Sequence, residues 1–191
     1  MLIDPLSWWT SEVSEFAPVG HVLRSHLCDR WTRFHSLPES KRYAESESEH
    51  EEVLRRHLVV ANELFTAGEP LYVYRSHVSE RRLKGKLKHM LAGNQLREAM
   101  VRLPTGLSIQ YEGDGYYCVR ALATRWVPLC FGTLTRQVAD CEESGVTFVS
   151  PATKNIFCPY DGGMDVFLAT SSPRSLEAKF QSWMSKREDR Q

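Results

Sequence analysis

Two carboxylates and a phenol lie close together between Phe157 and Asp165. The segment reads FCPYDGGMD, so Tyr160 and Asp161 precede a pair of glycines and Asp165 follows it. Carboxylates and a phenol at this spacing are suited to binding a cation or to general acid–base chemistry. An aspartate in such a turn more often accepts backbone N–H groups and fixes the turn. The segment therefore has a functional and a structural interpretation, and both stay open.

A second group of ionisable side chains occurs in residues 33–43, which read RFHSLPESKRY. Loops on a rigid scaffold often carry function, although this stretch is equally consistent with a polar connection between two elements. If the two segments form adjacent strands, their side chains converge in one polar pocket, as an active site requires. The candidate site is then Arg33, His35, Tyr160, Asp161 and Asp165.

A third cluster is basic and spans residues 81–88. Its five cations are Arg81, Arg82, Lys84, Lys86 and Lys88. One interpretation is a patch for phosphate or for an acidic partner, and the other is a solvated helix anchored by two leucines. Nucleic acid is disfavoured, because no aromatic residue for base stacking is interleaved and the chain's 24 basic and 24 acidic residues cancel.

The common catalytic and cofactor motifs are absent from the sequence. There is no phosphate-binding glycine loop, no G-x-S-x-G elbow and no C-x-x-C pair. His50 and His57 are seven residues apart, which is too far along a helix for one ion, so we predict surface positions for both. We expect no metal and no cofactor.

The compartment follows from the cysteines and from the start of the sequence. The five cysteines are odd in number and widely spaced, which is typical of reduced thiols rather than a secreted disulfide scaffold. The first residues, MLIDPLSWW, lack the basic and apolar regions of a secretory signal, and no apolar run approaches the ~20 residues that span a bilayer. We therefore expect a cytoplasmic protein without membrane contact.

Hydrophobic spacing predicts the elements that carry these residues. The strongest pattern is a helix over 48–67, begun by a capping box of Ser48 and Glu51 and ended by Gly68 and Pro70. Further helices are expected at 4–17, 19–28, 128–141 and from Ser172 onward, with a weak one at 80–91. Strands are expected at 31–37, 71–77, 107–111, 116–123, 146–149, 155–160 and 164–169.

This order lacks regular strand–helix alternation, so it predicts an α+β fold in which helices pack on one face of a mostly antiparallel sheet. The 191 residues fit a single domain. Residues 1–30 would form its helical N-terminal segment, and residues 155–186 a hairpin followed by the C-terminal helix.

Residues 155–170, together with Trp183, resemble a bacterial family known as domain of unknown function 3885. Its members show an aromatic residue, then Tyr-Asp-Asp-Arg-Gly-x-Asp, an apolar strand, and a helix carrying Tyr-x-x-Trp. Tyr160, Asp161, Gly163 and Asp165 match this pattern. Gly162 stands near the family's Asp-Arg, and Phe180 replaces the helix tyrosine. The resemblance implies a bacterial, cytoplasmic, single-domain protein and assigns no catalytic residue.

Three hypotheses follow. The first is a protein-interaction module, for example of the immunity-protein type, which predicts an exposed aromatic patch using Trp8, Trp9 or Trp126. The second is an enzyme of unrecognised type at the polar site near His35, Asp161 and Asp165. The third is a weak phosphate or nucleic-acid binder through residues 81–88. The first is favoured, with another protein as the expected partner.

Overall fold

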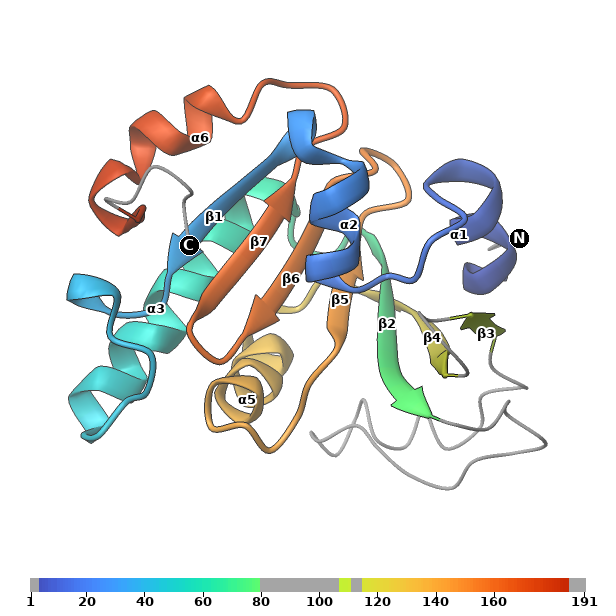
Figure 1. The fold of residues 1–191 in the computed structure, drawn as a ribbon. Coiled ribbons are helices and arrows are strands. Elements are labelled where there is room, and N and C mark those ends of the chain that lie inside the picture. Colours follow the sequence, from blue (N-terminus) through green and yellow to red (C-terminus); the bar gives the residue numbers. More distant parts are fainter. Residues whose placement is uncertain (1–3, 80–106, 111–114, 186–191) are drawn as a thin grey trace.

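A computed structural model describes residues 4–79, 107–110 and 115–185, and it contains one seven-stranded sheet (Figure 1). The strand order is β1-β7-β6-β5-β2-β4-β3, and every neighbouring pair is antiparallel. The strands are β1 (Trp31–His35), β2 (Pro70–Ser79), β3 (Leu107–Gln110), β4 (Tyr116–Arg125), β5 (Val146–Val149), β6 (Ile156–Tyr160) and β7 (Gly163–Phe167). The predicted antiparallel sheet and α+β class are confirmed.

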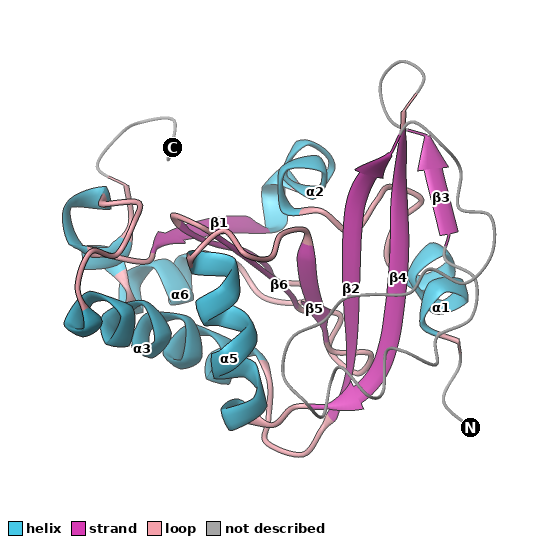
Figure 2. Cartoon of the chain, turned by 90° about the horizontal axis from the view of Figure 1, so that it is seen from below, coloured by secondary structure: helices cyan, strands magenta, loops and turns pink. Residues whose placement is uncertain are grey.

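Helices lie on both faces of this sheet (Figure 2). The long helices α3 (Glu47–Leu64) and α5 (Pro128–Ala139), with the short α6 (Arg174–Lys179), occupy one face, as expected. The short N-terminal helices α1 (Pro5–Glu12) and α2 (Gly20–His26) pack on the other face, whereas the sequence led us to expect helices on one face. Short 3-10 turns occupy Cys28–Arg30, Pro38–Ser40 and Gln181–Trp183.

Alternation along the strands sends side chains into two separate apolar layers. On β6, Phe157 belongs to the layer under α3 and α5, whereas Ile156 and Cys158 belong to the layer under α1 and α2. The residues of both layers are almost fully buried, so the central strands carry apolar side chains on both faces.

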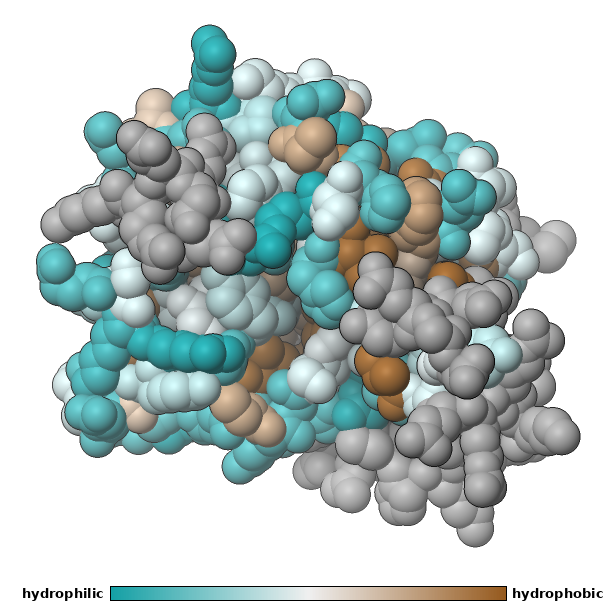
Figure 3. Space-filling model, in the orientation of Figure 1, coloured by the Kyte–Doolittle hydropathy of each residue, from teal (hydrophilic) through white to brown (hydrophobic). Residues whose placement is uncertain are grey.

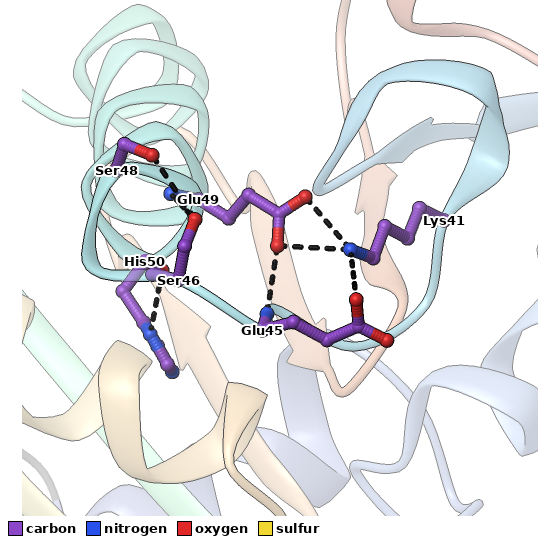
Figure 4. Close-up of polar contacts among 6 residues, drawn as sticks. All are labelled: Lys41, Glu45, Ser46, Ser48, Glu49 and His50. Atoms are coloured by element: carbon purple, nitrogen blue, oxygen red, sulfur yellow. Dashed lines mark hydrogen bonds and ion pairs between the residues drawn. The ribbon is translucent and has the colours of Figure 1, made fainter.

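Helix α3 confirms the strongest sequence pattern, but its predicted capping box was wrong by two residues. The N-cap is Ser46, whose hydroxyl accepts a hydrogen bond from the Glu49 backbone N–H. The Glu49 carboxylate accepts a bond from the Glu45 N–H and pairs with Lys41 (Figure 4). Ser46 and Glu49 have the same S-x-x-E spacing as Ser48 and Glu51, so spacing alone does not choose between them.

The ends of other elements also differ from prediction. The strand expected to reach residue 37 ends at His35, and the C-terminal helix breaks at Phe180 before a 3-10 turn continues to Trp183. The pairing of 156–160 with 163–167 confirms the predicted hairpin, and the strands expected at 107–111 and 116–123 pair with each other over 107–110 and 116–119. In the described part of the chain, no helix is both long and apolar enough to cross a membrane.

Candidate ligand-binding site

The sheet opens between β5 and β6, and this opening forms the candidate site. The two strands pair only at Phe148 with Phe157 and at Val149 with Ile156. Beyond these pairs β5 continues to pair with β2, and β6 with β7, so each strand stays anchored on its outer side. Pro159 has no N–H to donate to β5, which accounts for the early end of the ladder. In Figure 1 the two strands diverge below α2.

A cleft of about 270 Å³ occupies the α2 side of this opening. Its walls come from the first turn of α2, the start of β5, the end of β6, the middle of β7, and β1. The lining residues with polar or ionisable side chains are His21, Arg33, Cys158, Tyr160 and Asp165. The volume is near the lower end of the about 300–1,000 Å³ typical of ligand pockets, so it suits a small molecule.

Arg33 and Asp165 form a buried ion pair in the wall of this cleft. They are opposite each other on β1 and β7, on the face that α2 covers. The Arg33 Nε donates to Asp165 Oδ1 over 2.8 Å, and the Trp31 indole donates to the same oxygen over 2.8 Å. Arg33 Nη2 lies 3.3 Å from Asp165 Oδ2. The guanidinium also lies over the rings of Trp31 and Tyr160, at 5.4 and 5.0 Å from their centroids.

These contacts hold the guanidinium rigidly and leave part of it available. Within the described part of the chain, Arg33 Nη1 has no hydrogen-bond acceptor, and the Arg33 side chain is 13% exposed. The Tyr160 hydroxyl likewise has no hydrogen-bond partner among the described residues. Two residues that line the cleft thus carry donors without a partner in the described ranges, one on a planar cation and one on a phenol.

The ionisable groups in the cleft favour their neutral forms, apart from the ion pair. Burial raises the pKa of Tyr160 well above its ordinary value, although the Arg33 charge opposes the shift. Burial also raises the pKa of the Cys158 thiol. Burial and the charge of Arg24 lower the pKa of His21, whose Nε2 lies 2.8 Å from the Tyr117 hydroxyl. At pH 7 the cleft thus contains neither a thiolate nor a phenolate.

The structure brings together only three of the five predicted site residues. Arg33, Tyr160 and Asp165 line the α2-side cleft. His35 is opposite Gly163, one side-chain pair further along the ladder, and it does not line this cleft. Burial and the neighbouring Arg33 and Arg56 lower its pKa.

Asp161 faces a second cavity, of about 230 Å³, on the α5 side of the same opening. It forms an ion pair with Arg42 at 2.8 Å. Glu143 lines this cavity too and pairs with Arg75 at 2.6 Å. Gly145, Pro159 and Tyr160 line both cavities, so the two adjoin at the point where β5 and β6 separate.

Sequence reasoning missed the residues that α2 and the start of β5 contribute. A Cβ on Gly20 would lie 2.9 Å from Asp165 Oδ2, so α2 packs directly against the ion pair because this position is glycine. Gly145 has φ +65°, and a Cβ there would lie 2.0 Å from the Ser76 carbonyl oxygen. The glycine in P-V-G20 was the one available signal in the sequence.

The three tryptophans predicted to form an exposed patch for a protein partner are buried, so this prediction was wrong. Trp8, Trp9 and Trp126 are 6%, 1% and 1% exposed, because they fill the apolar layers against the sheet. Figure 3 shows small, separate hydrophobic areas on the described part of the α2 face rather than one broad patch. The large hydrophobic residues that are exposed in the described ranges are scattered: Tyr43, Val78 and Val127.

The histidine prediction was wrong for His57, which is buried between α3 and the β6–β7 hairpin. His50 is partly exposed, and its Nε2 lies 2.8 Å from Asp140 Oδ1. Cys28, Cys118, Cys141 and Cys158 are free thiols, as expected. In those ranges no group of three or more metal-binding side chains occurs. The basic segment Arg81–Lys88 lies outside the described residues.

The chain belongs to the family described as domain of unknown function 3885, whose family-wide pattern matches residues 19–188. The match extends the resemblance of the β6–β7 hairpin to nearly the whole chain. No curated protein and no solved structure matches the chain.

Proposed function

We propose that this member of the domain of unknown function 3885 family binds a small anionic ligand, a carboxylate or a phosphate, in the α2-side cleft. The observation that carries the proposal is the Arg33 guanidinium, which is fixed on one edge and has an unused Nη1 on the other. A planar guanidinium with free N–H groups matches the oxygen atoms of carboxylates and phosphates.

The charge balance around the cleft supports an anion. Asp165 compensates Arg33, but Arg24 lies nearby with its guanidinium 5.5 Å from the Trp31 ring and has no carboxylate partner in the described part of the chain. The local sum is one positive charge. In a partly enclosed cleft this charge is less screened than at the open surface.

A purely structural role for the Arg33–Asp165 pair would not require the unused donors. Two of the three guanidinium nitrogens suffice for the pair, and the indole of Trp31 satisfies the same carboxylate. Binding is favoured over nucleophilic catalysis, because burial keeps the thiol and the phenol of the cleft protonated at pH 7.

The test is calorimetric titration of the whole chain with acetate, inorganic phosphate and, as a neutral analogue, acetamide. We expect saturable binding of at least one anion and none of acetamide. Tyr160→Phe removes only the unpartnered hydroxyl, so its urea midpoint should stay unchanged while Kd for the anion rises about 10-fold.

Tyr43→Phe is the matched control, since Tyr43 is 49% exposed and does not line the cleft. It should leave Kd unchanged. The proposal fails if neither anion binds, or if Tyr43→Phe weakens binding as much as Tyr160→Phe does.

A further inference from the structure

We infer that the ligand is a zwitterion, with its anionic group at Arg33 and an ammonium group in the adjoining cavity on the α5 side. The inference rests on the proposed function and adds the chemical class of the ligand. It starts from two cavities of opposite chemistry that adjoin where β5 and β6 separate.

The α2-side cleft presents donors, as described above, whereas the α5-side cavity presents acceptors. Asp161 and Glu143 line the second cavity, but their arginine partners do not. Arg42 pairs with Asp161 from the exposed surface, where its side chain is 63% exposed. Arg75 pairs with Glu143 from β2. The lining of this cavity therefore includes two carboxylate residues and neither of the arginines that pair with them.

Tyr160 is the boundary between the two cavities. It lines both, its ring lies under the Arg33 guanidinium, and Asp161 is the next residue in the chain. A ligand that passes this ring would have a guanidinium at one end and carboxylates at the other. An amino carboxylate supplies the complementary pair of charges.

The cavities together also fit the size of such a molecule. They measure about 270 and 230 Å³, and either alone is small for a ligand of ordinary size. A linear amino acid with a few methylene groups would extend from one into the other past Pro159 and Gly145, which are shared by both linings. Neither of these residues has a charged or bulky polar side chain that would obstruct the methylene groups of the ligand.

The experiment titrates the chain with linear ω-amino carboxylates that have one to five methylene groups. Each is compared with the carboxylate of equal length that lacks the amine, and with the corresponding alkylamine. We expect one amino carboxylate to bind about 10-fold more tightly than its matched carboxylate, because its ammonium gains a charge-assisted contact. The alkylamine alone should bind more weakly than either.

Asp161→Asn should abolish that 10-fold preference and leave the affinity for the simple carboxylate unchanged. Asp161 is near the surface, so this variant should fold. Glu142→Gln is the matched control, because it removes one exposed negative charge nearby without altering either lining. It should preserve the preference.

The outcomes separate this inference from the proposed function. Equal affinity for the amino carboxylates and their matched carboxylates would overturn the zwitterion and leave the anion site standing. A preference that persists in Asp161→Asn would overturn the placement of the ammonium group. Absence of binding by every compound would overturn the inference and the proposed function together.

Discussion

Replacing His57 should remove a pH dependence from the stability of the fold. The ring is fully buried, with Nδ1 2.8 Å from the Val53 carbonyl oxygen and Nε2 3.2 Å from the Gly163 carbonyl oxygen. Both neighbours are acceptors, so only an imidazolium would donate to both. A neutral ring donates to one of them and leaves a lone pair facing the other.

Magnitudes decide between these two states. Burying an unpaired charge costs several kcal/mol, whereas a hydrogen bond to a charged group returns ~1.5–3 kcal/mol. Desolvation is therefore the larger effect, and it lowers the pKa of His57 from 6.5 to about 4 despite the two carbonyls. We conclude that the ring is neutral at pH 7 and donates from Nδ1, the shorter of the two contacts.

The sign of the pH effect follows from this lowered pKa. The unfolded chain binds a proton at His57 below pH 6.5, and the folded chain does so only below about 4. The stabilisation is therefore complete above pH 6.5 and is lost as the pH falls toward 4. At 1.36 kcal/mol per pKa unit, the loss amounts to ~3 kcal/mol.

The assay compares urea unfolding of the wild-type chain and of His57→Gln at several pH values from 7.5 to 4. Other titrating groups contribute to both proteins, so they cancel in the difference between the two free energies. Between pH 7.5 and pH 4 that difference should change by ~3 kcal/mol, because the wild type loses this stability at low pH and the variant does not. A constant difference, or an NMR titration that finds the ring protonated at pH 7, would refute the reasoning.

Two further substitutions test local features with matched controls. Ser46→Ala should cost about 1 kcal/mol of unfolding free energy because it removes the N-cap of α3, whereas Ser48→Ala should change stability by less than about 0.5 kcal/mol; equal effects in urea unfolding would contradict the assigned cap. Gly145→Ala should destabilise the chain by more than about 1 kcal/mol, because it combines φ +65° with a clash against the Ser76 carbonyl. Gly132→Ala, inside α5 with open space around its Cβ position, should instead stabilise by about 0.5–1 kcal/mol, and a thermal midpoint shifted the other way would count against this account.

Local sequence was sufficient where a residue's neighbours in the chain determine its conformation. The hairpin at Asp161 and Gly162 was predictable because a turn signal stands between two apolar runs, and the paired strands confirm it. Helix α3 was predictable from spacing, yet its first residue was not, since two serines offer the same capping chemistry. The burial of His57 was not predictable, because its helix lies against a hairpin more than a hundred residues later.

The candidate site, too, was predictable only in part from the sequence. The assumption that the two polar segments form adjacent strands placed Arg33, Tyr160 and Asp165 in one group, and β1 does pair with β7. The same reasoning included His35 and Asp161, which the structure places outside the α2-side cleft. It also assigned the tryptophans to a surface, although in the structure they fill the apolar layers.

The sequence by itself determined the antiparallel α+β class, the family and the segments that carry the polar residues, because these follow from periodicity, turn chemistry and a local motif. Only the tertiary structure decided that β5 and β6 separate beyond Phe157, that α2 packs against Asp165 through Gly20, and that two cavities adjoin at Tyr160. The physical reason is that a cleft is a property of surfaces brought together from distant parts of the chain. Its shape depends on packing between elements, which no local pattern of residues contains.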